Sequence, residues 1–160
     1  MEGTEMPEQS HAWLCQQIVD NAGDAIIFAD AEGTVRLWNA GAERIFGFRA
    51  DEMVGKSMDP IIPENLRERH WEGYDQTMKT GRTQYSRSLL AVPALRKDGT
   101  RVSIEFTIVV VRGEDGKLLG AAAILRDVTE RWNQNKELQK RLAALEAEIA
   151  RLTAGARGSA

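Results

Sequence analysis

Residues 24–48 have the sequence DAIIFADAEGTVRLWNAGAERIFGF, which contains two β-rich runs and the start of a helix. The runs, DAIIFAD and TVRLW, are separated by a short segment whose Gly33 suits a tight hairpin. Asn39 then stands where a helix cap belongs, and Gly47 stands where that helix would end. The stretch therefore predicts an antiparallel pair of strands followed by a short helix.

The chain beyond this stretch is expected to continue with helices. The segment 50–62 contains Pro60 and is expected to be broken into turns. Residues 65–80 can form one longer helix that ends at Gly81. The middle of the chain is therefore predicted to be helical.

Three further β-rich runs, at about 84–96, 101–111 and 117–126, are separated by two Asp-Gly turns, a strong hairpin signal. The order is therefore two strands, several helices and three strands. Such an order allows one five-stranded antiparallel sheet with the helices on one face. The predicted fold class is α+β.

Both ends of the chain carry helical patterns. Residues 1–8 are polar and are expected to be disordered, whereas apolar residues at helical spacing predict an amphipathic leader helix over 9–22. The compact domain is expected to span 23–127. A helix at 128–153 and a disordered tail at 154–160 are expected to follow it.

The C-terminal helix carries a heptad pattern of the kind found in parallel two-stranded coiled coils. Its predicted a positions are Asn135, Leu142 and Ile149, and its predicted d positions are Leu138, Leu145 and Leu152. A polar Asn at an a position favours a fixed register and a dimer. The pattern predicts a homodimer, to which the leader helix is expected to contribute because the seam is short. The alternative is that the helix folds back on its own domain.

The composition excludes several classes of function. The 160 residues include 21 basic and 24 acidic side chains, which is not the basic surface of a nucleic-acid-binding protein. Cys15 is the single cysteine, and no apolar run is long enough to cross a membrane. We therefore expect a cytoplasmic protein without nucleic-acid or membrane partners. No motif places a nucleophile beside a base, so no enzyme is expected.

Four stretches of the chain resemble PAS domains, the sensory modules of bacterial kinases, cyclases, phosphodiesterases and chemoreceptors. They are DAIIFADAEGTVRLWNAGAERIFGF, VGKSMDPIIPENLRERHWEGY, LRKDGTRVSIEF and ILRDVTERW, and the similarity covers about residues 12–132. The resemblance implies the PAS fold. It also implies that Asp127 and Thr129, in an Asp-x-Thr motif, pass changes in the sheet to the outgoing helix. Asp127 with Glu130 is equally suited to a capping box at that helix.

His70 is the residue with the most specific chemistry. In the haem-binding PAS subfamily of O₂, CO and NO sensors, the helix before the third strand provides the histidine that binds iron. His70 lies in the matching helix, at the matching distance from the Asp-Gly turn that follows. The resemblance implies b-type haem held by His70 in an apolar pocket, with one iron face open for a diatomic gas. Carried over residue by residue, it places Leu90, Phe106 and Ile108 on strands that face the iron.

The sequence departs from those haem sensors at four positions. Leu90 replaces the arginine that stabilises bound oxygen, and Ser88 replaces the methionine that is a sixth ligand in the phosphodiesterases. Gln76 and Gln84 replace groups that meet the haem propionates. Without the arginine, selectivity is expected to shift towards CO or NO, unless Tyr85 donates a hydrogen bond to the gas.

Two other functions remain open from the sequence. His70 can simply pack or cap its helix, and the domain is then a ligand-free module that pairs chains and docks a separate output protein. Trp38 and Trp71 can instead line a pocket for non-covalent FAD, although packing in the core is the commoner use of tryptophan. Covalent flavin chemistry is excluded because Cys15 lies outside the sensor domain. In each case an output protein is expected to act in trans.

Overall fold

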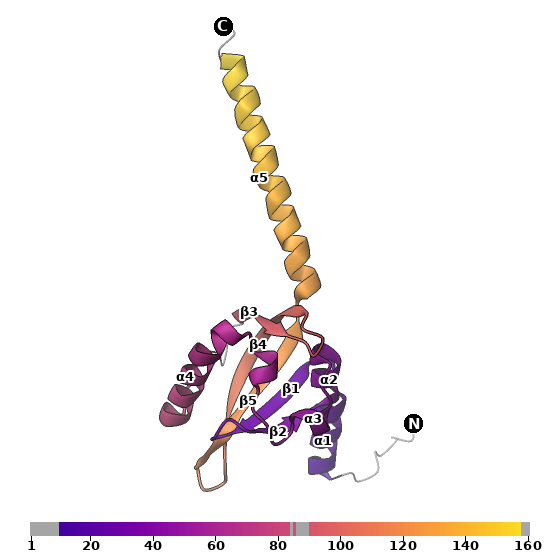
Figure 1. The fold of residues 1–160 in the computed structure, drawn as a ribbon, viewed down its shortest axis with the longest axis vertical. Helices are drawn as coiled ribbons and strands as arrows, with labels where there is room; N and C mark the ends of the chain where they lie inside the picture. Colours follow the sequence, from indigo (N-terminus) through magenta and orange to yellow (C-terminus); the bar gives the residue numbers. More distant parts are fainter. Residues whose placement is uncertain (1–9, 84, 86–89, 158–160) are drawn as a thin grey trace, which may run out of the picture. The chain divides into compact units, whose positions relative to one another are not determined.

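The computed structural model describes residues 10–83, 85 and 90–157. The chain divides into two compact units, Met1–Asp127 and Val128–Ala160 (Figure 1). The first unit contains a sheet with helices, and the second contains a single helix. Each unit is described by itself.

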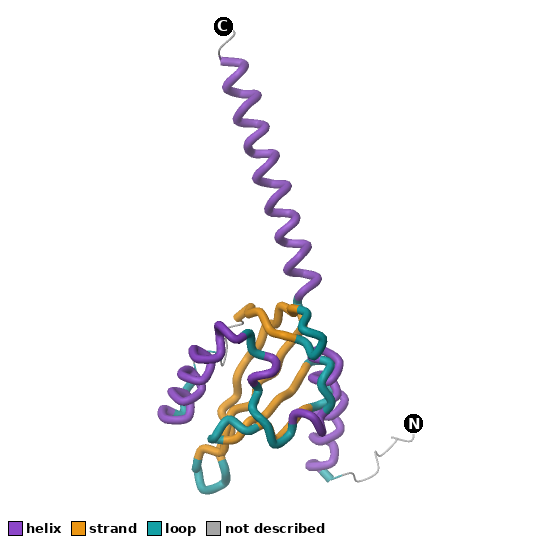
Figure 2. The backbone as a smooth tube through the Cα atoms, in the orientation of Figure 1, coloured by secondary structure: helices purple, strands orange, loops and turns teal. Residues whose placement is uncertain are grey.

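The sheet of the first unit has five strands in the order β2-β1-β5-β4-β3, and all neighbours are antiparallel. The strands are β1 (Ala25–Asp30), β2 (Val35–Trp38), β3 (Leu90–Leu95), β4 (Arg101–Arg112) and β5 (Leu118–Asp127) (Figure 2). Strands β1 and β5 pair although they lie at opposite ends of the domain sequence. The arrangement confirms the predicted α+β class, the N-terminal hairpin and the three-stranded meander.

The described part of the third strand begins at Leu90. The expected strand at 84–96 is found only as β3, and residues 84 and 86–89 lie outside the described residues. Tyr85 lies in a turn, where its carbonyl oxygen accepts one hydrogen bond from the N–H of Ile108 at 3.1 Å. Pro93 is tolerated within β3 because this strand lies at an edge of the sheet.

Helices of the first unit occupy the positions that the sequence predicted. They are α1 (His11–Asn21), α2 (Ala40–Phe46), α3 (Ala50–Met53), the 3₁₀ turn η1 (Asp59–Ile61) and α4 (Glu64–Thr80). Figure 1 shows α2 and α3 next to β1 and β2. Helices α2 and α4 both end at glycines in the left-handed conformation, Gly47 with φ 77° and Gly81 with φ 64°.

The hydrophobic core lies between the helices and the inner face of the sheet. Burial alternates along β1, where Ala25, Ile27 and Ala29 are buried and their neighbours are half-buried. The largest fully buried side chains are those of Phe46, Ile27, Met53, Val35 and Val102. Because these residues come from α2, α3 and three strands, one apolar cluster holds the helices on the sheet.

Asn39 is buried and hydrogen-bonds to three segments of the chain. Its Oδ1 atom accepts hydrogen bonds from the N–H groups of Ala42 at 2.9 Å and Ile26 at 2.8 Å. Its Nδ2 atom donates to the carbonyl oxygens of Val19 at 2.8 Å and Asp24 at 3.1 Å. Asn39 therefore caps α2, as predicted, and also joins the end of α1 to the start of β1.

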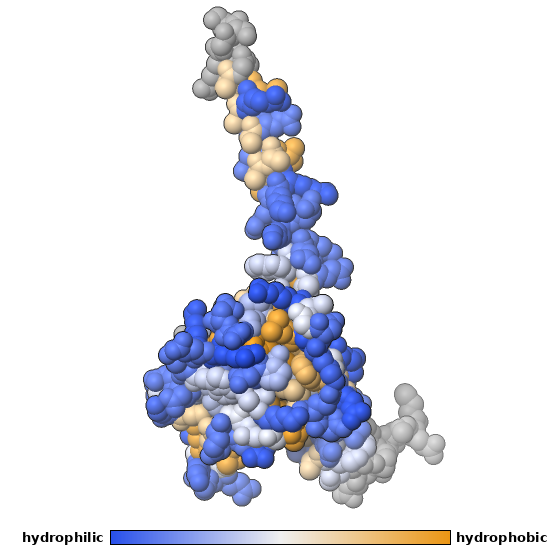
Figure 3. All heavy atoms as spheres, in the orientation of Figure 1, coloured by the Kyte–Doolittle hydropathy of each residue, from blue (hydrophilic) through white to orange (hydrophobic). Residues whose placement is uncertain are grey.

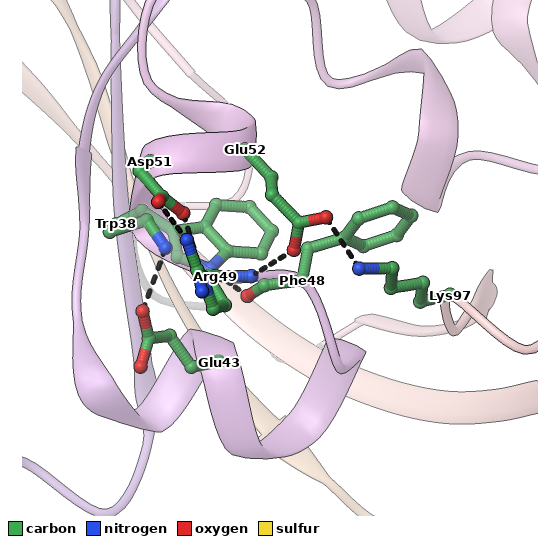
Figure 4. A network of polar contacts seen from close by, with 8 residues as sticks. Trp38, Glu43, Phe48, Arg49, Asp51, Glu52 and Lys97 are labelled. Carbon is green, nitrogen blue, oxygen red and sulfur yellow. Dashed lines mark hydrogen bonds and ion pairs between the residues drawn. The ribbon is translucent and has the colours of Figure 1, made fainter.

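The turn between β3 and β4 is bonded to the segment around α2 and α3 (Figure 4). The N–H of Lys97 donates to the carbonyl oxygen of Phe46 at 2.8 Å, and its ammonium group pairs with Glu52. The same ammonium lies 5.8 Å from the centre of the Phe48 ring. Trp38 Nε1 donates to the carbonyl oxygen of Phe48 at 3.0 Å. These contacts fix the β3–β4 edge against the helices.

The second unit is helix α5 (Thr129–Arg157). It continues past the predicted end at 153, since the strong helix formers Ala154, Ala156 and Arg157 surround the single unfavourable residue Gly155. The predicted tail at 154–160 is therefore wrong for 154–157, and 158–160 lie outside the described residues. The five apolar side chains of the heptad pattern are 57% to 62% exposed, and Figure 3 shows hydrophobic atoms along this helix.

Within the described residues, no helix combines the length and the apolar character that crossing a membrane requires.

Replacing Asn39 by alanine is expected to lower the free energy of unfolding by about 2–4 kcal/mol, because four backbone groups that are buried or partly buried lose a hydrogen bond. Asn39→Ser keeps an acceptor for the cap and should cost less. The exposed Gln76→Ala on α4 is the control, with a change within about 0.5 kcal/mol. Urea unfolding followed by tryptophan fluorescence measures all three. An Asn39→Ala variant as stable as the control would contradict this role.

Candidate functional site

A cavity of about 390 Å³ lies between α4 and the sheet. Its volume is typical of sites for small molecules and cofactors, which occupy about 300–1,000 Å³. The wall is mainly aliphatic and aromatic, and includes Ile27, Ile62, Val92, Ile104, Phe106 and Leu125. The cavity can therefore hold an apolar ligand away from water.

One stripe of α4 faces the cavity. It consists of Leu66, Arg69, His70, Gly73, Tyr74 and Thr77. These positions are three or four residues apart, so they share one side of the helix. A Cβ atom at Gly73 would meet no atom within 4 Å. The glycine therefore leaves open space beside His70.

The imidazole of His70 is the chemically distinctive group of the cavity. Its Nδ1 atom is buried and has no hydrogen-bond partner among the described residues. Burial lowers the pKa of His70 below its ordinary value, and the Asp59 carboxylate opposes that shift only in part. The ring is therefore neutral at pH 7, which is the form that binds metals.

Aromatic residues beside His70 anchor α4 to the rest of the unit. Trp71 Nε1 donates to Asp59 Oδ1 at 2.7 Å. The hydroxyl of Tyr74 donates to the carbonyl oxygens of Ala29 at 3.0 Å and Asp30 at 2.6 Å. Burial raises the pKa of Tyr74 to about 12, so the hydroxyl stays protonated and can donate.

The close contact between Trp71 and the β1–β2 turn depends on glycine. A Cβ atom at Gly33 would lie 2.5 Å from the Trp71 ring, and Gly33 has φ 82°. The ring of His70 lies 4.8 Å from that of Trp71 and 6.4 Å from that of Tyr74, measured between centroids. The His70 ring therefore lies next to Trp71 and Tyr74, the two side chains that attach α4 to the β1–β2 hairpin.

The structure brings together four of the five cofactor residues predicted from the sequence. His70, Tyr85, Phe106 and Ile108 all line the cavity. The Tyr85 and Phe106 rings meet edge to face with centroids 5.6 Å apart. Leu90 is paired with Phe106 at the start of β3, but its side chain lies outside the described part of the chain, as do Ser88 and Gln84.

Other expectations about the pocket do not hold. Trp38 and Trp71 were candidates for a flavin pocket, but neither lines the cavity, because Trp38 packs on Phe46 in the core and Trp71 faces Gly33. Gln76 is exposed on α4 and does not line the cavity either.

Most of the lining was not predicted from the sequence, and Arg69 and Met58 are two examples. Arg69 belongs to the α4 stripe, so helical spacing counted from Leu66 could have identified it. Met58 lies just before η1, in a segment without periodicity, and no sequence signal marked it.

The predicted signalling residues lie at the end of the sheet and the start of the C-terminal helix. Asp127 is the last residue of β5, and its carboxylate accepts a hydrogen bond from Arg96 at 2.7 Å. Arg96 also donates to the carbonyl oxygen of Ile45 at 2.9 Å. Asp127 is thus fixed to the β3–β4 turn and, through Arg96, to α2. Thr129 is the first residue of α5, and its role stays a prediction.

The family of the chain follows from comparison with known proteins. The sequence model of the protein family described as PAS fold matches residues 19–133 of the chain. The chain therefore belongs to the PAS family, and it is a sensory module of the kind found in signalling proteins. A crystal structure of a PAS domain from Colwellia psychrerythraea has the same fold, with a TM-score of 0.66 and 23% identity. That match covers 76% of this chain and 99% of the other.

Two curated relatives match most of this chain but are much longer than it. One is an uncharacterised protein of Azorhizobium caulinodans, 32% identical over 124 residues. Another is the oxygen sensor protein DosP of Escherichia coli, 25% identical over 139 residues. The matches cover 77% and 79% of this chain, which spans only 17% of the length of either relative.

The buried, neutral state of His70 predicts a pH dependence. The unfolded chain takes up a proton on this residue below about pH 6.5, whereas the folded chain resists it, so stability falls as the pH decreases through that range. His70→Leu removes this contribution. We therefore expect the stability of the ligand-free wild type to fall relative to His70→Leu between pH 7.5 and pH 5, measured by urea unfolding. A constant difference between the two proteins over this range, or a matching effect in the exposed control His11→Leu, would contradict the prediction.

Proposed function

We propose that the cavity binds b-type haem through His70 and that the domain senses a diatomic gas. The observation that carries this proposal is the buried Nδ1 atom of His70, which has no partner among the described residues and belongs to a residue that lines a mainly apolar cavity. A buried polar atom without a partner is unfavourable unless a ligand satisfies it. The similarity to an oxygen sensor protein supports the same reading.

The residues around the cavity suit a haem group. A neutral imidazole can bind iron, and aliphatic walls exclude water from a porphyrin. When bound, haem would supply an iron atom with one face available to O₂, CO or NO. His70 would orient the group, and Phe106 and Ile108 would keep water away from it. Tyr85 lines the cavity on the side of the strands, and we propose that its hydroxyl donates a hydrogen bond to the gas.

A ligand at His70 would change the output by shifting an equilibrium between two states of the domain. Helix α4 is held on the β1–β2 hairpin by Trp71 and Tyr74, which both contact the His70 ring. Strand β1 pairs with β5 along its length, and β5 continues in sequence into α5. We propose that Asp127 and Thr129 pass the change to α5, and that an output protein responds in trans. The domain itself acts by binding, without catalysis.

The haem proposal is tested by purifying the full chain with haem supplied and recording its absorption spectrum. We expect a Soret band from bound haem in the wild type and in His11→Ala, whose exposed imidazole lies on α1. His70→Ala should lose that band or shift it. A wild type without a Soret band, or a band unchanged in His70→Ala, would overturn the assignment.

A second function is favoured by α5 alone. Its seam of Leu138, Leu142, Leu145, Ile149 and Leu152 is exposed, and burying such a seam against a second copy is favourable whether or not the cavity is filled. The domain would then act as a ligand-free homodimer that docks an output protein. The two functions share the dimer and differ only in the role of the cavity.

Dimerisation is tested with a pair of matched substitutions on α5. Leu145→Asp puts a carboxylate at a d position, whereas Ala147→Asp puts the same charge on the outer side of the helix. We expect Leu145→Asp to weaken the dimer at least about tenfold, as should deletion of residues 133–160, and Ala147→Asp to leave it unchanged. Sedimentation equilibrium measures the dimer dissociation constant of the wild type and of each of these three variants. A dimer that survives the deletion would show that the seam does not hold the chains together.

A further inference from the structure

The described residues of the cavity wall carry positive charge and no negative charge. Arg69 is the cationic residue among the cavity-lining residues in the described part of the chain, and that lining includes no aspartate or glutamate. His70 adds no charge at neutral pH because burial holds its pKa down. A wall with one positive charge and no negative charge is complementary to an anionic group on a ligand.

Two hydroxyl groups that share the lining with Arg69, those of Tyr74 and Thr77, already have hydrogen-bond partners. The Tyr74 hydroxyl donates to the carbonyl oxygens of Ala29 and Asp30. The Thr77 hydroxyl donates to the carbonyl oxygen of Gly73 at 2.9 Å. These groups therefore do not compete with Arg69 for an acid at the cavity.

The side chain of Arg69 forms neither an ion pair nor a hydrogen bond with the described residues, whereas each of the other two cations of α4 has a partner. Lys79 pairs with Asp75 at 2.5 Å, and Arg67 donates to the carbonyl oxygen of Ile62 at 3.2 Å. Arg69 is exposed overall although it lines the cavity. Arg69 is therefore a cavity-lining residue that water also reaches, and it is next in sequence to His70.

We infer that the ligand of this cavity is an amphipathic carboxylic acid whose acid group is bound by Arg69. The apolar body of such a ligand fills the space beside Gly73, and its carboxylate stays at the solvent edge, where desolvation costs least. The inference rests on the proposed haem site and assigns to Arg69 the role that the family resemblance had placed at Gln76, which does not line the cavity. It also applies to a carboxylic acid without iron.

The test uses four probes and the full chain. Haem and iron-free protoporphyrin IX carry carboxylates, and the dimethyl ester of each does not. We expect Arg69→Gln to weaken binding of the two acids about tenfold, the value of one charge-assisted hydrogen bond, and to leave both esters unchanged. Arg69→Lys should restore part of the affinity, because it keeps the charge and loses the forked geometry.

Lys79→Gln is the matched control, since it removes the same charge from the same helix outside the cavity. It should leave all four affinities unchanged, and absorption and fluorescence titrations measure them. Equal weakening of acids and esters in Arg69→Gln, or no weakening at all, overturns the inference.

The design separates this inference from the haem proposal. Haem binding that is insensitive to His70→Ala, with Arg69 still discriminating acid from ester, refutes the haem ligand and keeps the acid site. Haem binding that depends on His70 but not on Arg69 supports the haem ligand and refutes the acid site. A chain that binds none of the four probes refutes both.

Discussion

The side chain of Asn39 sets the geometry on which the rest of the domain depends. A buried primary amide must satisfy both its oxygen and its nitrogen, and Asn39 does so with groups from α1, the start of β1 and the first turn of α2. Moving any one of these segments would leave a buried polar atom without a partner. The side of the domain that carries β1, β2 and α2 is therefore held rigidly, and the apolar cluster around Phe46 packs against it.

The opposite side of the domain is built differently. No whole residue of helix α4 is fully buried, and the helix lies over a cavity, attached by the hydrogen bonds of Trp71 and Tyr74. A rigid half and a half that is attached at a few points are what a sensor needs, because a ligand can then move one against the other. His70 lies at the junction, in contact with both anchoring rings. The proposed ligand would therefore bind next to the two side chains that attach α4.

The sequence was sufficient for most of the fold, since its signals are local. The cap at Asn39, the glycines at 47 and 81 and the Asp-Gly turns each depend on neighbours in the chain, and all are found where the pattern placed them. The additional hydrogen bonds of Asn39 to Val19 and Asp24 could not be predicted from the sequence, because they join segments that come together only in the folded structure. The same reason explains why the ion pair of Arg96 with Asp127 was not expected.

The candidate site was predictable only through the resemblance to haem sensors. That resemblance placed His70, Phe106 and Ile108 correctly on the cavity wall, but it directed attention to Gln76 and away from Arg69. The side that a helical residue faces depends on how α4 is rotated against the sheet. Trp71 packs against Gly33 and helps to fix this rotation, but the sequence marked Gly33 only as a turn residue and did not indicate this contact. The family pattern therefore identified residues of the cavity wall better than it identified the polar residue at its edge.

The central claim is that His70 provides the ligand for a group held between α4 and the sheet. A crystal structure of the full chain, purified with haem supplied, tests this claim most directly. The account predicts density for a porphyrin in the cavity, with its iron bonded to the imidazole of His70 and a carboxylate directed at Arg69. A cavity filled by protein side chains, or a porphyrin bound elsewhere with His70 packed in the interior, would contradict it.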